Sequence, residues 1–356
     1  MNLDTTISCL TDAPRLLGGW RAAVAVALVA AATATACGSS GSGTASVPAV
    51  APRTTPETAP TPSATTAGTS TATSTATSTA TSTATESTTA TSAAASIERP
   101  TGPRDEIVAV DGESIHLRCD GDGPATIVLV AGFEGDSSTW SAVEPTLAAA
   151  TRVCSYDRPG TGGSGPPTTV TTFAAQADLL HDLLEQAAEP GPYVLVGHSF
   201  GGAEAVEYTS RHRDDVAGLV LVDASPTDWP TSLCAVADDG SSAAATVLGL
   251  CAGWADPRAN VEWLDVPAAF EHVASTATAG SFDDLPLVVI TAVDRELPPG
   301  LATTEIRRLN DAWNTGQQRW AALSTSSLVV TVPDTSHHIE LDRPALVVES
   351  ISGLLP

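Results

Sequence analysis

Short, unbroken apolar runs recur along the last two thirds of the chain. They occupy residues 126–130, 152–156, 193–196, 219–222, 287–290 and 328–332. Runs without polar alternation are typical of strands buried on both faces of a parallel sheet. Between them, segments such as 173–188 carry apolar residues at helical spacing and are expected to cover the sheet. The pattern predicts an α/β fold with helices on both faces of a mostly parallel sheet.

Three further segments add to this outline. Residues 107–110 and 114–119 flank Asp111-Gly112, which predicts a hairpin, and residues 141–150 are expected to form a helix. About sixty residues, 226–284, lie between the fourth and fifth of the apolar runs and contain several large aromatic side chains. This segment is too long for a connection and too small for a domain, so we expect a cap over the sheet.

Composition divides the chain unequally. Of its 356 residues, those from 37 to 98 are mostly Thr, Ser, Ala, Pro and Gly, with TATS repeats over 71–85. Such a segment has too little large apolar surface to offset the entropy of ordering, and we expect a disordered linker. Residues 99–356 remain for one folded domain of ordinary size.

The charge balance excludes some partners. The net charge is −25, and every basic side chain is an arginine. An acidic, lysine-free chain is a poor match for nucleic acid or for an anionic membrane surface. The charge disfavours these partners without identifying one; the small-molecule substrate that we expect comes from the motifs described below, and the sequence leaves the oligomeric state open.

The N-terminus has the layout of an export signal. Arg15 and Arg21 precede the apolar run 22–32, which leads to small residues and then to Cys37. A cysteine after small residues resembles a bacterial lipobox, so we expect residues 1–36 to be a signal peptide and Cys37 to carry lipid. The protein would then be anchored to the outer face of the cell membrane, with simple secretion as the alternative. This arrangement resembles exported actinobacterial lipoproteins.

Four cysteines remain in the folded part: Cys119, Cys154, Cys234 and Cys251. An even number in an exported protein predicts two disulfides. None of them shows CxxC spacing and no histidine cluster accompanies them in the sequence, so we expect no metal site.

The segment YVLVGHSFGG, 193–202, places one serine in a GxSxG pattern after an apolar run. A serine hydroxyl needs a base and oxyanion donors to act as a nucleophile. A sharp strand-to-helix turn exposes such a hydroxyl, and Gly197 and Gly201 permit it on either side of Ser199. The amide of Phe200 would face the oxyanion. The alternative is a glycine-rich turn with an idle serine.

Four further motifs, in order, resemble the α/β-hydrolase family from residue 107 onward, and its serine esterase and lipase branch in particular. They are VLVAGFEGDSSTW, YDRPGTGGSG, LVLVDASP and DTSHHIELDRP. The first departs from the family, because Ala131 stands where histidine is frequent. The resemblance implies an eight-stranded sheet, a cap after the sixth strand, and Phe133 as the second oxyanion amide.

The resemblance also implies a catalytic triad. The histidine near the end of the chain is His337, with His338 as the neighbouring alternative. Two aspartates compete for the role of the acid: Asp294, which we favour because it follows the seventh strand, and Asp223, which ends the sixth. His198 should point away from the nucleophile. Serine at the elbow excludes the branches of the family that attack with aspartate.

The fold further implies the disulfide pairing. Its second and fourth strands are neighbours, which pairs Cys119 with Cys154. Cys234 and Cys251 both lie in the expected cap and form the second pair.

Three functions remain open at this point. The first is an exported hydrolase of carboxylic esters that uses an acyl-enzyme and no cofactor. The second is a peptidase or amidase of the same fold, and the third is an inactive surface lipoprotein that binds a ligand. A cap with several tryptophans and few basic residues favours an apolar acyl or alcohol group.

Overall fold

A computed structural model describes residues 100–293, 295 and 297–355. The expected signal peptide, the linker and Cys37 lie outside the described residues. Within the described part of the chain, every helix is too short or too polar to cross a membrane.

Eight strands form one sheet in the order β1-β2-β4-β3-β5-β6-β7-β8. The first two strands are antiparallel to their neighbours, and all later pairs are parallel. The expected eight-stranded, mostly parallel sheet is confirmed. The strands are β1 (Arg104–Val110), β2 (Glu113–Asp120), β3 (Thr126–Val130), β4 (Arg152–Asp157), β5 (Tyr193–His198), β6 (Val216–Val222), β7 (Leu287–Ala292) and β8 (Ser327–Val332).

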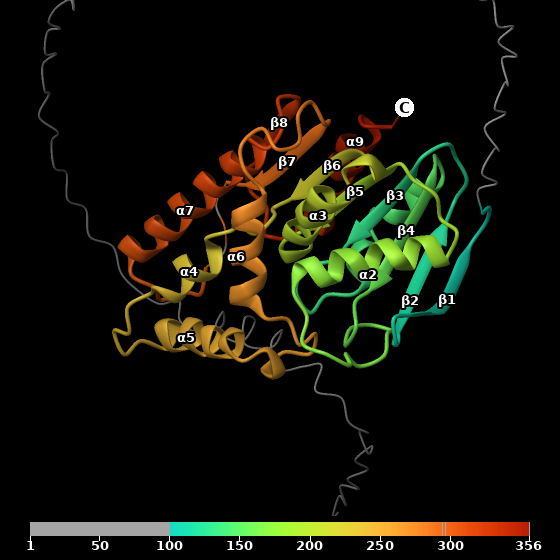
Figure 1. The fold of residues 1–356 in the computed structure, drawn as a ribbon. Coiled ribbons are helices and arrows are strands. Elements are labelled where there is room, and N and C mark those ends of the chain that lie inside the picture. The colour runs from blue at the N-terminus through green and yellow to red at the C-terminus, as the bar shows by residue number, and fades with distance from the viewer. Residues whose placement is uncertain (1–99, 294, 296, 356) are drawn as a thin grey trace, which may run out of the picture. The chain divides into compact units, whose positions relative to one another are not determined.

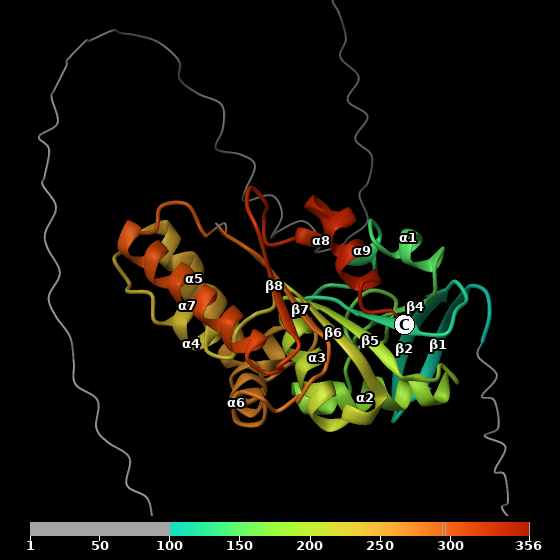
Figure 2. The ribbon, with the colours of Figure 1, turned by 90° about the horizontal axis from the view of Figure 1, so that it is seen from above.

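Helices cover both faces of the sheet (Figures 1 and 2). One face carries α1 (Glu144–Ala148), α8 (Ile339–Asp342) and α9 (Pro344–Ser352). The other carries α2 (Phe173–Gln186) and α3 (Phe200–Arg211). The long helix α7 (Thr303–Ala321) lies beside the segment that connects β6 to β7.

The alternation along β5 shows why its apolar run is continuous. Val194 and Val196 pack in the core under α1 and α9, whereas Leu195 packs in the core under α2 and α3. Each side chain is fully buried, since successive residues of a strand point to opposite faces. Two cores therefore share the central strands and fix the carboxyl ends of β5 and β6 side by side.

Two predicted elements differ from the structure. The run 328–332 was expected to be buried, but β8 is the edge strand and Leu328 is 58% exposed. The predicted helix over 141–150 is confined to α1, preceded by a 3-10 helix, η1 (Ser137–Trp140). Pro145 lies in the first turn of α1. Proline is tolerated there but disrupts a helix interior, so a helix that begins at 141 is excluded.

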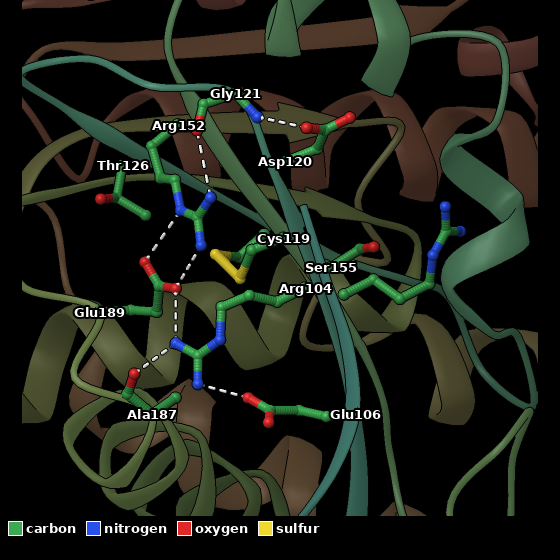
Figure 3. Close-up of a disulfide and its surroundings, with 12 residues drawn as sticks. Arg104, Glu106, Cys119, Asp120, Gly121, Thr126, Arg152, Ser155, Ala187 and Glu189 are labelled. Atoms are coloured by element: carbon green, nitrogen blue, oxygen red, sulfur yellow. Dashed lines mark hydrogen bonds and ion pairs between the residues drawn. A yellow bond between two sulfur atoms is a disulfide. The ribbon is translucent and has the colours of Figure 1, made fainter. Parts of the chain in front are cut away.

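The segment 226–284 forms α4 (Trp229–Cys234), α5 (Ser242–Ala255), the 3-10 helix η3 (Pro257–Ala259) and α6 (Val266–Thr276). A short 3-10 helix, η2 (Arg213–Asp215), precedes β6. The structure contains both predicted disulfides. Cys234 of α4 is bonded to Cys251 of α5, and Cys119 is bonded to Cys154 directly opposite it on the neighbouring strand (Figure 3).

Candidate active site

Ser199 stands at the turn between β5 and α3, with φ 53° and ψ −124°. A positive φ is uncommon for a residue with a side chain, and such strain costs on the order of 1–3 kcal/mol. Backbone hydrogen bonds hold the turn. The Ser199 amide donates to the carbonyl of Val222 at 3.2 Å, and the Ser199 carbonyl accepts from the amides of Gly202 and Ser225 at 3.0 Å each. The surrounding backbone therefore fixes the unusual conformation of Ser199.

Glycines around Ser199 permit this close packing. A Cβ on Gly197 would lie 2.4 Å from the carbonyl oxygen of Gly201, and one on Gly201 would lie 2.2 Å from that of Ala131. A Cβ on Gly202 would lie 2.3 Å from the Cβ of Ala224. The strand, the helix and the loop after β3 thus approach closer than any side chain allows, which explains the GxSxGG pattern.

His337 joins Ser199 to an aspartate. Its Nε2 lies 2.9 Å from the Ser199 hydroxyl oxygen, and its Nδ1 lies 2.6 Å from Oδ2 of Asp223. The three side chains come from the turn after β5, the end of β6 and the loop after β8. With Nδ1–H donated to the carboxylate, Nε2 is left as an acceptor for the proton of the serine hydroxyl. His337, rather than His338, occupies this place.

The preference for Asp294 as the partner of His337 is corrected by this geometry. Asp223, the alternative, is the carboxylate hydrogen-bonded to Nδ1 of His337, while Asp294 itself lies outside the described residues. The physical reason is the sheet order. Strand β6 is the direct neighbour of β5, so the carboxyl ends that carry Ser199 and Asp223 meet at the same edge. From the sequence, the ends of both β6 and β7 could supply the acid, and the resemblance favoured the end of β7.

Asp223 is ionised although it is fully buried. Burial raises the pKa of a carboxyl group, but here the hydrogen bond and charge of His337, with Arg295 and Trp313, outweigh it and hold the pKa of Asp223 below its usual value. Burial also lowers the pKa of His337, and its contact with Asp223 only partly restores it. The resting site therefore holds a carboxylate beside a neutral imidazole, which is the state that can accept a proton.

His198 supports the loop that carries His337. Its Nε2 donates to the carbonyl of His337 at 3.0 Å. Burial lowers the pKa of His198 to about 4, so the ring is neutral near pH 7. On the same loop, His338 is hydrogen-bonded through Nδ1 to Glu340 at 2.9 Å. These contacts fix the backbone on both sides of the base.

The two expected oxyanion amides belong to segments that adjoin the elbow. Phe200 is the first residue of α3, and the first amides of a helix have no carbonyl partner within it. Phe133 follows Gly132, where a Cβ would come within 3.2 Å of the Ser199 Cβ. The rings of Phe133 and Phe200 also contact each other, with centroids 5.0 Å apart. The loop after β3 therefore lies directly against the serine.

A profile of the alpha/beta hydrolase family matches residues 127–350. This span includes Ser199, Asp223 and His337, which form the hydrogen-bonded relay described above. The chain belongs to the alpha/beta hydrolase family.

Two curated relatives illustrate the range of the family. The pimeloyl-[acyl-carrier protein] methyl ester esterase of Nitrosomonas europaea is 32% identical over 124 residues, which are 33% of this chain and 46% of that protein. The uncharacterized protein YqjL of Bacillus subtilis is 31% identical over 115 residues, which are 32% of this chain and 46% of YqjL. The hydrolase thus spans less than half the length of these relatives.

Solved structures share the fold over most of the chain. Cfl2 of Burkholderia cenocepacia is 21% identical with a TM-score of 0.51, covering 72% of this chain and 97% of Cfl2. DBJA, as its mutant dbja delta, is 18% identical with a TM-score of 0.53, covering 70% of this chain and 99% of DBJA. Identities this low establish the common fold alone.

Aromatic rings surround the elbow of this hydrolase. The Phe200 ring lies 5.5 Å from that of Trp254 in α5 and 4.8 Å from that of Phe270 in α6. Phe173 of α2 contacts Phe270 in turn, at 5.1 Å. Helices of the segment 226–284 therefore place apolar rings beside the residue that follows Ser199. Trp263 of the same segment lies under the guanidinium of Arg258.

One group of side chains near the site has metal-ligating chemistry. Ligand atoms of His198, His338 and Glu340 lie within 4.8 Å of one another. However, His198 donates through Nε2 to a backbone carbonyl, and His338 is bonded to Glu340. These bonds occupy Nε2 of His198, Nδ1 of His338 and Oε1 of Glu340, and we assign the three residues to the support of the histidine loop.

Two residues that contact Asp223 could not be predicted from the sequence. Trp313 of α7 donates its indole N–H to Asp223 at 3.0 Å, and Arg295 lies with Nε 3.5 Å from the same carboxylate. The side chain of Arg295 is only 9% exposed. The amphipathic pattern of α7 predicts that Trp313 is buried, but it does not say against which residue. No sequence pattern near Trp313 or Arg295 predicts a contact with Asp223.

Proposed function

We propose that this alpha/beta hydrolase cleaves carboxylic esters with Ser199 as the nucleophile and an acyl-enzyme as the intermediate. The observation that carries the proposal is the continuous relay from Ser199 through His337 to the buried Asp223, with heavy-atom distances of 2.9 and 2.6 Å. Both distances lie within hydrogen-bond reach, as a nucleophile, its base and an orienting acid require.

The reaction proceeds in two halves. The Ser199 oxygen attacks the ester carbonyl carbon while its proton passes to Nε2 of His337, and the amides of Phe133 and Phe200 hold the oxyanion. Collapse breaks the bond to the alcohol, which takes the proton from His337. Water then attacks the acyl-enzyme by the same route and releases the acid. Asp223 remains ionised and stabilises the imidazolium, and no cofactor takes part.

The aromatic rings beside the elbow favour an ester over a peptide. Binding a peptide terminus requires charged or polar side chains, whereas Trp254 and Phe270 offer only apolar surface next to Phe200. A small-molecule ester with an apolar acyl or alcohol group fits these surroundings. The peptidase or amidase and the inactive binding protein remain the alternatives that an assay must exclude.

The test is Ser199→Ala in the full-length protein, assayed with p-nitrophenyl esters of increasing chain length and with aminoacyl anilides. We expect the variant to fold normally, to lose ester hydrolysis, and to lose labelling by a fluorophosphonate probe. Ser225→Ala is the matched control, because its hydroxyl lies 3.3 Å from that of Ser199 but has no contact with His337 among the described residues. Turnover carried by purified Ser199→Ala would refute the proposal, and faster cleavage of anilides than of esters would favour an amidase.

We also propose that the enzyme is exported and held at the outer face of the membrane by lipid on Cys37. The sequence pattern before Cys37 and the two disulfides of the domain support this location.

A further inference from the structure

Arg158 and Glu262 form a buried ion pair beside the loop that carries Phe133. Their side chains are 4% and 1% exposed. Nε of Arg158 donates to one carboxylate oxygen at 2.7 Å, and Nη2 donates to the other at 3.0 Å. Burial alone would lower the pKa of Arg158, but the adjacent carboxylates raise it, so the guanidinium is charged. Arg158 lies within the motif YDRPGTGGSG.

Arg158 uses all of its donors. Besides Glu262, Nη1 donates to the carbonyl of Ala131 at 2.7 Å and to Glu204 of α3 at 3.3 Å. Its Nη2 also donates to the carbonyl of Gly132. A guanidinium has five N–H groups in a rigid fork, and here each one has an acceptor. An ammonium group offers three donors at a single point and cannot replace this arrangement.

The contact with Gly132 fixes the direction of a neighbouring amide. The carbonyl of Gly132 and the N–H of Phe133 belong to the same planar, trans peptide unit, in which they point in opposite directions. On the other side of Phe133, the amide of Glu134 donates to Glu262. The ion pair therefore holds both peptide planes that flank Phe133.

Glu262 brings a distant segment into this contact. It lies between η3 and α6, 104 residues along the chain from Arg158. Gln176 of α2 donates to the same carboxylate at 3.3 Å. The segment 226–284 is thus joined by a buried carboxylate to the loop that borders Ser199.

We propose that Arg158 and Glu262 are positioning residues that orient the Phe133 N–H toward the oxyanion, so that the segment 226–284 helps to assemble the catalytic site. This inference rests on the proposed function. In enzymes that react through a tetrahedral oxyanion, removal of one hydrogen-bond donor to that oxyanion lowers kcat on the order of 10²- to 10³-fold. Misorientation of the Phe133 amide should cost a comparable factor. It should act on kcat, because the oxyanion is absent in the bound ester and develops only on the way to the tetrahedral intermediate.

The primary test is Arg158→Lys, which keeps a positive charge but loses the fork. We expect kcat for a p-nitrophenyl ester to fall on the order of 10²-fold per site titrated with fluorophosphonate, with KM nearly unchanged. Glu262→Gln keeps the shape of the side chain and one acceptor oxygen, and a smaller loss in the same direction is expected. It also keeps the proposal testable if Arg158→Lys fails to fold.

A second measurement separates orientation from general disruption. The rate ratio between an ester and its thionoester reports the oxyanion contacts, because sulfur accepts hydrogen bonds weakly. We expect this ratio to fall in both variants. A purely structural role would change the fraction of folded enzyme and leave the ratio per titrated site unchanged.

The chain offers a matched control in a second buried pair, Arg152 and Glu189 (Figure 3). Arg152 donates to Glu189 through Nε at 3.1 Å and Nη2 at 2.6 Å, and its Nη1 donates to the carbonyls of Gly102 and Gly121. Arg152 begins β4, whereas Arg158 follows its last residue, so the two pairs lie at opposite ends of one strand. Arg152→Lys should reduce stability but not kcat or the ester-to-thionoester ratio.

Three outcomes would overturn the inference. They are an unchanged kcat in folded Arg158→Lys and Glu262→Gln, an unchanged ester-to-thionoester ratio, or an equal loss of kcat in Arg152→Lys. Failure of the proposed function has a different signature, since turnover would then persist in Ser199→Ala.

Discussion

The carboxylate of Asp223 has partners on both of its oxygens. Oδ2 accepts from His337 at 2.6 Å. Oδ1 accepts from the Thr291 hydroxyl and the Ala292 amide at 3.1 Å each, and from Trp313 at 3.0 Å. These donors keep a fully buried carboxylate ionised and aim it at one ring nitrogen. The acid is therefore held by β7 and α7 as well as by its own strand.

Asp223→Asn should lower kcat on the order of 10⁴-fold, the loss measured in the best-studied triad, because an amide no longer fixes the tautomer of His337. The variant keeps the size of the side chain, so we expect the fold to persist. Asp294→Asn is the comparison, measured with the same ester after each variant is shown to be folded. A crippled Asp294→Asn beside a nearly normal Asp223→Asn would reverse the assignment.

Arg295 places a positive charge beside Asp223, the carboxylate that contacts His337. Its guanidinium lies 3.3 Å from the ring centroid of Trp313 and 4.6 Å from that of Trp229, with Nε 3.5 Å from Asp223. Burial lowers the pKa of Arg295 to about 10, so it is charged at neutral pH. Its charge disfavours the imidazolium and contributes to the lowered pKa of His337, after burial of the ring itself.

Arg295→Gln should shift the acid limb of the pH profile to higher pH. His337 must be neutral to accept the serine proton, so activity is lost as pH falls through its pKa. Removal of the nearby positive charge raises that pKa. We would measure kcat/KM for an uncharged ester from about pH 5 to 8, because this quantity reports the free enzyme. The control is Arg319→Gln, which removes a half-exposed arginine paired with Asp228. A limb that stays in place, or moves to lower pH, would contradict the role of Arg295.

At the scale of elements, the central strands could be predicted because burial on both faces leaves a signature in the sequence. Residues 127–130 of β3 and 193–196 of β5 all pack in one core or the other. The sharp turn at Ser199 could be predicted for a similar reason, because the glycines that it requires stand beside the serine in the sequence. An element can therefore be predicted from the sequence when its own residues determine how it is buried or how it turns.

Other features depend on contacts that no local pattern records. The run that forms β8 is apolar like the run that forms its neighbour β7. However, β8 lies at the edge of the sheet, and Leu328 is exposed there. Asp223 and Asp294 both follow apolar runs, and only the packing of β6 against β5 singles out the former. Glu262 lies in a segment whose aromatic residues predicted a cap, whereas its partner Arg158 is far away in the chain. Such pairings are fixed by the assembled fold.

At the scale of the whole molecule, the cysteines of the described domain are consistent with an oxidising compartment. Cys119 is paired with Cys154, and Cys234 with Cys251. Disulfides persist in exported proteins and are rare where thiols are kept reduced. The net charge of −25 gives no electrostatic attraction to an anionic bilayer, so attachment to the membrane would have to come from lipid.

Cys37→Ala should therefore move the enzyme from the membrane fraction into the medium without changing its kcat. Cys37 precedes the expected linker and lies outside the described residues, so the folded domain and its site remain intact in the variant. We would follow esterase activity and antibody signal in washed membranes and in the medium, with a Ser199→Ala strain to subtract other esterases. If wild type and variant partition alike into the medium, the protein is simply secreted. If both stay inside the cell, the export proposal is wrong, because a processed signal would carry either form across the membrane.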